Sequence, residues 1–197
     1  SGPGMVNSAH ALTTAIESCR PDIVMQCGCA GIFRSSGLDI GDVAIAISER
    51  DIHLGIESEK TDDSEDQEMP PSPLPFDIPG TGRNGIIDLS GDLHEKCFRI
   101  ISECRDFMTL SGNFITVSTV TATDRRAALL HKWYNPVMES MEGAAGAQIT
   151  ALYGIPFIEI RSGSNFVGKR DRKNWNLPLA FRNCSIAVMK IINELFQ

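Results

Sequence analysis

The 197-residue sequence lacks the features that mark several classes of protein. No apolar run approaches the length of a transmembrane helix, and no segment combines a charged stretch, an apolar stretch and a small-residue cleavage site. A basic patch is missing too: the net charge is −7, and residues 57–68 alone hold seven acidic residues and one lysine. We therefore expect a cytoplasmic protein that binds neither membranes nor nucleic acid.

Signatures of metal binding and of disulfides are also missing. None of the six cysteines forms a C-x-x-C pair, and the four histidines are scattered without ligand spacing. Cys27 and Cys29 flank Gly28 at the end of an apolar run, where small and soft side chains pack well. We expect reduced structural thiols, no bound metal and no organic cofactor.

The sequence instead alternates between helix and strand patterns. Apolar residues at helical spacing predict helices over residues 6–19, 124–133 and 178–196. β-branched and apolar runs predict strands over residues 22–27, 43–47 and 114–120. This order and length predict a single α/β domain over residues 1–197, with helices flanking a mostly parallel, mixed central sheet.

One segment interrupts the alternation. Residues 57–85 are first acidic and then rich in proline, with prolines at positions 70, 71, 73, 75 and 79. Prolines this close together suit neither a helix nor a central strand. We predict a mobile insertion or lid here, not a linker between domains.

The segment from Val137 to Asp171 concentrates polar residues near the ends of predicted strands. Glu142 follows Met141 where a strand-like run gives way to an alanine-rich helix, and the next strand delivers Ser164 and Asn165. A helix between two strands usually places them parallel in one sheet. The two polar groups are therefore expected at neighbouring strand ends, where they would form a site.

M-E-G-A-A followed by S-N resembles the signature of the purine nucleoside phosphorylase and nucleosidase superfamily, which carries M-E-x-A-A and then R-x-x-S-D. Asparagine in place of aspartate, trailed by V-G-x-R-D and a tryptophan, is similar to the futalosine hydrolases within it. The resemblance runs from Gly2 to about Asn193 and is poor between Glu57 and Asn113. It implies a nucleoside phosphorylase-like three-layer fold and at least a homodimer. It also implies hydrolysis of futalosine to hypoxanthine and dehypoxanthinylfutalosine in menaquinone biosynthesis.

The resemblance and the residue types together suggest catalytic roles. Glu142 would accept hydrogen bonds from the ribose hydroxyls and stabilise the oxocarbenium character of the transition state, while Met141 packs against the sugar. Asn165, supported by Ser164, would donate to N7 or O6 of a 6-oxopurine, whereas aspartic acid there suits a 6-aminopurine. The plain structural alternatives are a helix-terminal carboxylate and a turn asparagine.

Other parts of the expected pocket are carried over from the resemblance. Gly28, Ala30 and Gly31 resemble a G-x-A-G turn whose glycines let backbone N–H groups approach the sugar or an anion. A plain tight turn is the alternative. Gly163 replaces a residue that is more often aliphatic, which would loosen the pocket wall.

The resemblance also extends to the far side of the pocket. Val120 and Thr121 resemble the end of a strand that lines the base pocket, and a core strand is the alternative. Arg170 is a candidate partner for the benzoate carboxylate of futalosine, and a solvated helix start is the alternative.

Three other functions stay open on the sequence. A phosphorylase of the same fold would need a cationic phosphate pocket, for which Arg34 is a candidate. A methylthioadenosine or adenosylhomocysteine nucleosidase would favour aspartate at position 165. A non-catalytic paralogue would bind a purine nucleoside without turning it over.

The start of the chain bears on the last alternative. S-G-P-G-M-V-N resembles the family's S-G-x-G-K-V-N lead into its first long helix, and in the family several strands precede that helix. One of those strands supplies the acidic residue that activates water. We therefore expect an N-terminally truncated chain whose water-activating residue lies upstream of Ser1.

Overall fold

The computed structural model describes residues 1–58, 69–82 and 85–195. Helices and strands alternate along this part of the chain. The helices are α1 (Met5–Cys19), α2 (Asp92–Ser102), α3 (Asp124–Tyr134), α4 (Gly143–Tyr153) and α5 (Leu177–Leu195). The strands are β1 (Val24–Ile32), β2 (Val43–Arg50), β3 (Ile86–Asp88), β4 (Thr109–Thr116), β5 (Met138–Ser140) and β6 (Phe157–Phe166). Two short 3-10 helices, η1 (Arg34–Ser36) and η3 (Arg172–Asn174), lie in the connections.

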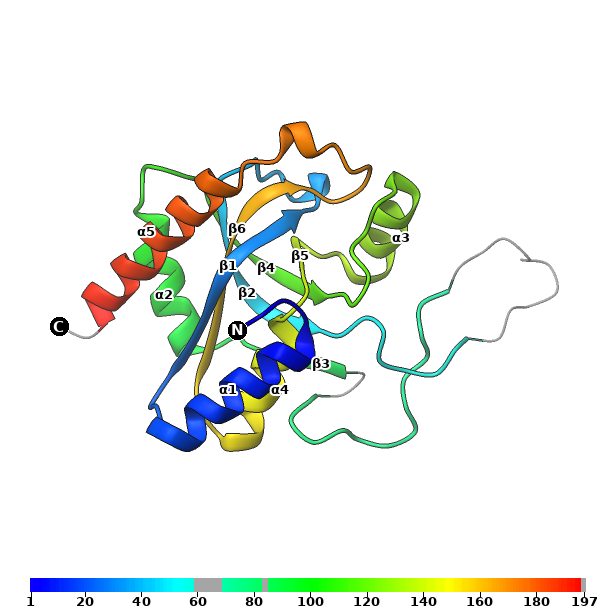
Figure 1. Cartoon of the computed structure of the whole chain (residues 1–197), viewed down its shortest axis with the longest axis horizontal. Helices are drawn as coiled ribbons and strands as arrows, with labels where there is room; N and C mark the ends of the chain where they lie inside the picture. Colours follow the sequence, from blue (N-terminus) through cyan, green and yellow to red (C-terminus); the bar gives the residue numbers. More distant parts are fainter. Residues whose placement is uncertain (59–68, 83–84, 196–197) are drawn as a thin grey trace.

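The strands form one mixed sheet in the order β3-β2-β4-β5-β1-β6 (Figure 1). A further pairing of β2 with β6 closes most of this sheet into a ring. Pairing is parallel between β1 and β6, β2 and β4, and β4 and β5, and antiparallel at the other contacts. The predicted α/β fold with a mixed central sheet is confirmed, whereas the closure into a ring was not predicted.

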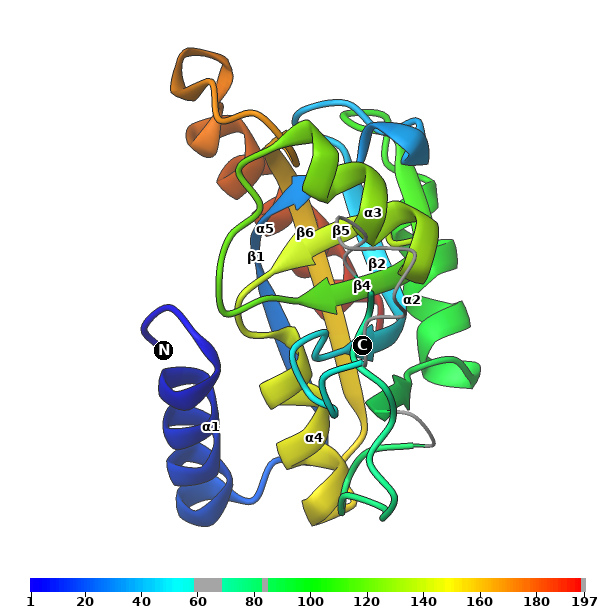
Figure 2. The same cartoon turned by 90° about the vertical axis from the view of Figure 1, so that its right-hand side faces the viewer.

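Helices cover the sheet on both sides. Figure 1 shows α2 and α5 on one side of the sheet and α3 on the other, which gives the predicted three layers. Helix α1 packs against α4 rather than directly on the strands, and Figure 2 shows these two helices side by side. Helix α4 packs against the sheet with its N-terminus towards the strands, and α1 covers the outer face of α4.

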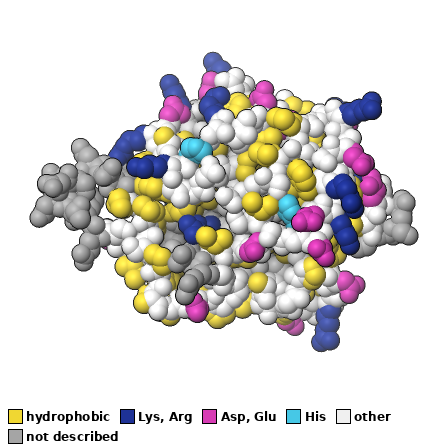
Figure 3. Space-filling view, turned by 180° about the vertical axis from the view of Figure 1, so that it is seen from behind, with side chains coloured by type: hydrophobic (Ala, Val, Ile, Leu, Met, Phe, Trp, Pro, Cys, Tyr) yellow, Lys and Arg dark blue, Asp and Glu magenta, His cyan; other side chains and the backbone are white. Residues whose placement is uncertain are grey.

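Charged side chains of both signs share the surface seen from behind in Figure 3. Lys and Arg side chains are interspersed with Asp and Glu around the rim of this face, and hydrophobic side chains lie among them. In the part of the chain that the structure describes, no helix is long and apolar enough to cross a lipid bilayer.

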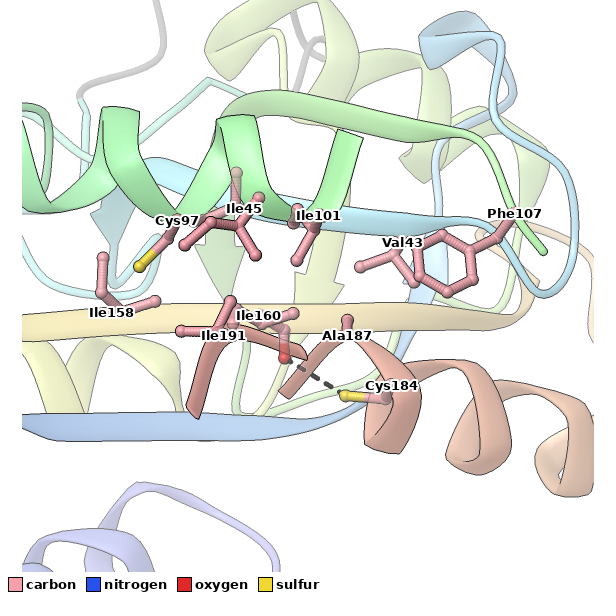
Figure 4. Close-up of a cluster of buried hydrophobic side chains, with 11 residues drawn as sticks. Val43, Ile45, Cys97, Ile101, Phe107, Ile158, Ile160, Cys184, Ala187 and Ile191 are labelled. Carbon is pink, nitrogen blue, oxygen red and sulfur yellow. Dashed lines mark hydrogen bonds between the residues drawn. The ribbon is translucent and has the colours of Figure 1, made fainter. Parts of the chain in front are cut away.

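The largest apolar cluster lies between α2, α5 and the sheet (Figure 4). It includes Ile45 of β2, Ile101 of α2 and Ile191 of α5, all fully buried. Two of the cysteines, Cys97 and Cys184, belong to this cluster, and all six cysteines are free thiols. The Cys184 thiol lies 3.7 Å from the carbonyl oxygen of Ile160, which ties α5 to β6.

Two predicted strand boundaries are wrong. Residues 28–31 do not form a turn, because β1 continues through them to Ile32 and stays paired with β6 along its whole length. β4 begins at Thr109 and ends at Thr116, so Val120 and Thr121 lie in the loop that follows it. Glycine is unfavourable in a strand unless a neighbour needs the space of its side chain, and that need is visible only in three dimensions.

The predicted parallel arrangement of the strands on either side of α4 is also wrong. β1 lies between β5 and β6, and it pairs antiparallel with β5. Gly31 of β1 is paired with Glu139 on one side and with Asn165 on the other. The ends of β5 and β6 still lie near each other, with β1 between them.

The predicted insertion at residues 57–85 lies partly outside the described residues, which omit 59–68 and 83–84. Its described parts contain no helix or strand beyond an isolated bridge between Ile56 and Ser72. The amide of Gln148 in α4 donates to the carbonyl oxygen of Pro79 at 3.0 Å, so the proline-rich part contacts the body of the domain.

Gly163 is required because its neighbours leave no space for a side chain. The structure therefore gives it a packing role in place of the expected loosening of the pocket wall. A Cβ atom at Gly163 would overlap the side chain of the fully buried Ile32 in β1. We predict that Gly163→Ala lowers the free energy of unfolding by about 1–3 kcal/mol through overpacking, as measured by urea denaturation. Ile32→Val removes the overlapping methyl group, so the double variant should lose less than the sum of the two single losses. Additive losses would contradict this account.

Candidate active site

The carboxylate of Glu142 is held at the junction of β5 and α4. Its Oε1 accepts from the backbone N–H of Gly4 at 2.9 Å, and its Oε2 lies 3.4 Å from Nη1 of Arg161. The side chain makes no capping hydrogen bond to α4, although Glu142 is the N-cap residue. A carboxylate held this way, with 17% of the side chain exposed, has acceptor capacity left for a ligand.

Arg161 carries the positive charge of this site. Its Nε donates to Oε1 of Glu159 at 2.8 Å, and its side chain is only 5% exposed. Burial alone would lower the pKa of the Arg161 guanidinium, but the carboxylates of Glu159 and Glu142 raise it overall. A Cβ atom on Gly28 would lie 3.0 Å from Nη1, so the glycine makes room for the guanidinium.

A third carboxylate, Glu49 of β2, completes the buried cluster. Glu49 and Glu159 are both fully buried, and each has one oxygen with no hydrogen-bond partner among the described residues. Burial and the neighbouring charge of Glu159 raise the pKa of Glu49 well above its usual range. The Arg161 guanidinium, which is paired with Glu159, opposes this rise.

The N-terminus of α4 is anchored to this cluster. The hydroxyl of Thr116 donates to Oε1 of Glu49 at 2.6 Å and accepts from the backbone N–H of Ala144 at 2.8 Å. A Cβ atom on Gly143 would lie within 2.6 Å of oxygens of both Glu49 and Glu159. Only glycine at this position lets the carboxylates approach the helix terminus.

The carboxamide of Asn165 is fixed by its neighbours. Its Oδ1 accepts from the hydroxyl of Ser164 at 2.8 Å, and its Nδ2 donates to the carbonyl oxygen of Phe166 at 3.1 Å. The Ser164 hydroxyl also lies 3.3 Å from the carbonyl oxygen of Ala30. A Cβ atom on Gly31 would come within 3.5 Å of Nδ2, so the space beside this amide depends on the glycine.

The loop after β4 meets the same part of the sheet. The backbone N–H and the hydroxyl of Thr121 donate to the two oxygens of Glu139, at 3.0 and 2.5 Å. Thr121 is buried, while Val120 beside it is partly exposed. Met141, two residues after Glu139, packs against the apolar cluster beneath α3.

Arg170 lies apart from these buried groups, at a cavity of about 810 Å³. The cavity adjoins Asn165, since Phe166 and Val167 form part of its wall, and Arg34 and Lys169 add two further cations. The guanidinium of Arg170 lies 4.8 Å from the ring centroid of Trp175, and that of Arg34 lies 3.9 Å from the ring centroid of Phe166. The cavity thus combines aromatic surface with three cations and two carboxylates, those of Asp124 and Asp171.

Sequence reasoning had missed several residues of this arrangement. Arg161 is the arginine of the R-x-x-S-N pattern, and two charged residues inside the apolar strand F-I-E-I-R were an available signal. Glu49 and Glu139 carried no such signal, because their roles depend on pairing between distant strands. The contact of Gly4 with Glu142 joins residues 138 positions apart.

No three His, Cys, Asp or Glu side chains gather into a possible metal site within the described residues. The polar groups of the site instead bond to one another or to the backbone. The site contains the Glu142 carboxylate next to the Arg161 guanidinium and the Asn165 amide, which is held by hydrogen bonds. A cavity lined in part by cations lies nearby. These groups suit a neutral polyol attached to a heterocycle with an anionic substituent.

Comparison with known proteins agrees with this description. Residues 1–195 match the phosphorylase superfamily. A 5'-methylthioadenosine/S-adenosylhomocysteine nucleosidase of Bacillus cereus is 28% identical over 198 residues, which cover 99% of this chain and 79% of that protein.

Solved structures show the same fold. A 5'-methylthioadenosine/S-adenosylhomocysteine nucleosidase from Colwellia psychrerythraea in complex with adenine superposes with a TM-score of 0.76 at 24% identity, covering 99% of this chain and 76% of its own. The futalosine hydrolase of Helicobacter pylori gives a TM-score of 0.79 at 20% identity, covering 98% and 77%.

The buried Glu49 carboxyl predicts a pH-dependent stability. Between the ordinary pKa of 4.5 and the raised pKa in the folded state, the folded protein binds the extra proton, so the free energy of unfolding falls as pH rises. Glu49→Gln stays neutral and keeps an oxygen for the Thr116 hydroxyl. We expect the variant to gain stability relative to the wild type above about pH 5, by up to about 1.4 kcal/mol per pH unit.

Chemical denaturation between pH 5 and pH 9 measures this difference. Glu95→Gln, at an exposed position of α2, is the matched control and should show no such trend. A difference between Glu49→Gln and wild type that does not change with pH would contradict the buried protonated carboxyl.

Proposed function

Because the chain belongs to the phosphorylase superfamily, we propose that it is an N-glycosyl hydrolase that cleaves the N-ribosidic bond of a purine nucleoside, and that this nucleoside is futalosine. The products would be hypoxanthine and dehypoxanthinylfutalosine, in a step of menaquinone biosynthesis. Nucleosidase activity has support from the Bacillus cereus relative, whose name states that activity. The choice of futalosine depends on the site.

The observation that carries this choice is the orientation of the Asn165 amide. Ser164 occupies Oδ1, and the backbone of Phe166 takes one hydrogen of Nδ2. The second hydrogen of Nδ2 is left as a donor, and N7 and O6 of hypoxanthine are both acceptors. This supports a 6-oxopurine as the leaving group, with departure assisted by a hydrogen bond rather than by full proton transfer.

Glu142 and Arg161 supply the other half of the chemistry. Cleavage of the N-ribosidic bond places positive charge on the sugar, and a carboxylate beside the ribose stabilises that charge in a site with little water. The hydroxyls of the ribose would donate to the acceptor positions of Glu142 that Gly4 and Arg161 leave free. The contact with Arg161 would fix the position of the carboxylate before substrate arrives.

The cavity beside Asn165 supports an anionic substituent on the substrate. Arg34, Lys169 and Arg170 border it, and aromatic side chains form part of its wall. A benzoate group would place its ring against the aromatic surface and its carboxylate near a guanidinium. A thioether substituent of the methylthioadenosine type would offer these cations no anionic partner.

Two functions of the same fold are the alternatives. The named activity of the relatives favours a nucleosidase for 6-aminopurine thionucleosides, for which Asn165 is a poorer match. Arg34 at the cavity favours a phosphorylase that binds phosphate. Assays with futalosine and with methylthioadenosine, each with and without phosphate, separate the three. Phosphate-independent release of hypoxanthine from futalosine alone is the expected result.

The first catalytic prediction concerns Glu142. In the full-length protein, Glu142→Gln should keep the fold but lower turnover of futalosine at least about a hundredfold, because it removes one charge contact to the transition state. Release of hypoxanthine under saturating substrate is the measurement. Glu95→Gln, the same chemical change at an exposed site, should turn over at the wild-type rate. A Glu142→Gln enzyme close to wild type would remove this residue from the mechanism.

The second prediction concerns the base. Asn165→Asp should shift the ratio of kcat/KM for futalosine and its 6-amino analogue toward the analogue, because an acidic side chain can protonate N7 and accept from the exocyclic amine. Total activity should fall, since the rest of the pocket suits another base. Steady-state kinetics of both enzymes with both substrates tests this. An unchanged ratio would show that Asn165 is a structural turn residue.

A further inference from the structure

We propose that His53 and Arg126 form a binding site for an aromatic carboxylate. Both residues line a cavity of about 440 Å³ between α3 and the segment that follows β2. His53 is exposed, so a ligand can reach this cavity from solvent. Neither Glu142 nor Asn165 lines the cavity, so the site is separate from the groups assigned to bond cleavage.

The hydrogen bonds of His53 show which of its ring nitrogens carries the hydrogen. The backbone N–H of Ser118 donates to Nδ1 at 3.1 Å, so Nδ1 itself carries no hydrogen. Burial lowers the pKa of the His53 imidazole, as does the charge of Arg126, while the carboxylate of Asp51 opposes this change. The ring is therefore neutral near pH 7, with its hydrogen on Nε2.

Arg126 places a second donor next to the first. Its Nη2 lies 3.2 Å from Nε2 of His53, and both nitrogens carry hydrogen. Neither nitrogen can accept from the other, so the two N–H groups need an acceptor from elsewhere. The oxygens of a carboxylate placed beside them would satisfy both donors, and the negative charge would strengthen both hydrogen bonds.

No ion pair within the described residues neutralises the charge of Arg126. Its Nε is also buried there without a hydrogen-bond partner. Its charge acts on the pKa of Glu139, but Thr121 already donates to both oxygens of that carboxylate. Arg126 is partly buried, and a buried charge is costly unless it is paired, so a bound anion would remove part of this cost.

Local hydrogen bonds hold the backbone of both residues in place before a ligand arrives. Oδ1 of Asp51 accepts from the backbone N–H of His53 at 2.9 Å. Arg126 lies in the first turn of α3, where its backbone N–H donates to the hydroxyl of Thr123 at 3.2 Å. Because these groups are already positioned, little conformational freedom would be lost on binding.

The rest of the cavity wall favours a planar, apolar ligand body. Trp133 and Tyr134 at the end of α3 line it, together with Leu130 and Ile52. Glu57 also belongs to the wall, but it is exposed, so solvent screens its charge. Aromatic and aliphatic side chains beside two nitrogen donors suit a ligand that has a planar ring and one carboxylate.

The two tryptophans of the sequence report separately on this cavity and on the cavity beside Arg170. Trp133 lines the cavity of His53 and Arg126, whereas Trp175 contacts Arg170 at the other one. Their indole N–H signals, assigned with Trp133→Phe, can be followed one by one in a nuclear magnetic resonance titration. Benzoate should shift the Trp133 signal to saturation. Benzamide, which has the same ring without the charge, should bind at least about tenfold more weakly.

Two variants test the donors, and a third is the matched control. Arg126→Met keeps an unbranched side chain without the guanidinium and should weaken benzoate binding at least about tenfold. His53→Asn keeps an acceptor for the Ser118 N–H but loses the Nε2 donor, so the affinity should fall about threefold to tenfold. Lys132→Met removes an exposed cation from the same helix and should leave the affinity within about twofold. Thermal denaturation confirms that each variant is folded.

A Trp133 signal that stays in place, or that responds equally to benzoate and benzamide, would overturn the proposed site. This comparison uses only the wild type, so it decides even if Arg126→Met does not fold. Equal benzoate affinity of the wild type and a folded Arg126→Met would also overturn it. A shift of the Trp175 signal alone would place the carboxylate at the cavity beside Arg170, which agrees with the proposed function and contradicts a site at His53.

Discussion

The site depends on the burial of one guanidinium group. Arg161 is 4% exposed, and a cation so far from water is tolerated only when carboxylates surround it with good geometry. Glu159 and Glu142 meet this need, and each is thereby held in place. The same requirement explains two glycines. A side chain at Gly28 would crowd the guanidinium, and a side chain at Gly143 would keep the carboxylates away from the helix terminus.

This buried charge also connects Glu142, the proposed catalytic carboxylate, to the rest of the fold. Arg161 lies on β6, Glu49 on β2 and Thr116 at the end of β4, and the backbone of α4 is bonded to Thr116. A shift of any of these elements would change the position of Glu142. The ring closure between β2 and β6 therefore supports the geometry of the candidate site as well as the core, because it fixes two of the carboxylate-bearing strands relative to each other.

Much of the fold and part of the site could be predicted from the sequence. Helical spacing located α1, α3 and α5 to within one or two residues, because this signal is local. The pairing of β1 between β5 and β6 could not be predicted, since strand order depends on contacts between distant segments. For the same reason Glu142 and Asn165 could be predicted as site residues from short motifs, whereas the positions of Glu49 and Glu139 in the cluster could not. The glycines of β1 were misread as a turn because the side chains that need their space come from β6.

The contact between Gly4 and Glu142 has a consequence for the order of events during folding. It joins two residues 138 positions apart, and the pairing of β1 with β6 spans a similar length of chain. Contacts of such high sequence separation form late, because much loop entropy must be lost before they can be made. The carboxylate thus gains its hydrogen bond from Gly4 only when the first residues of the chain have reached α4, so partly folded forms would hold this acid by its contact with Arg161, 19 residues away, alone.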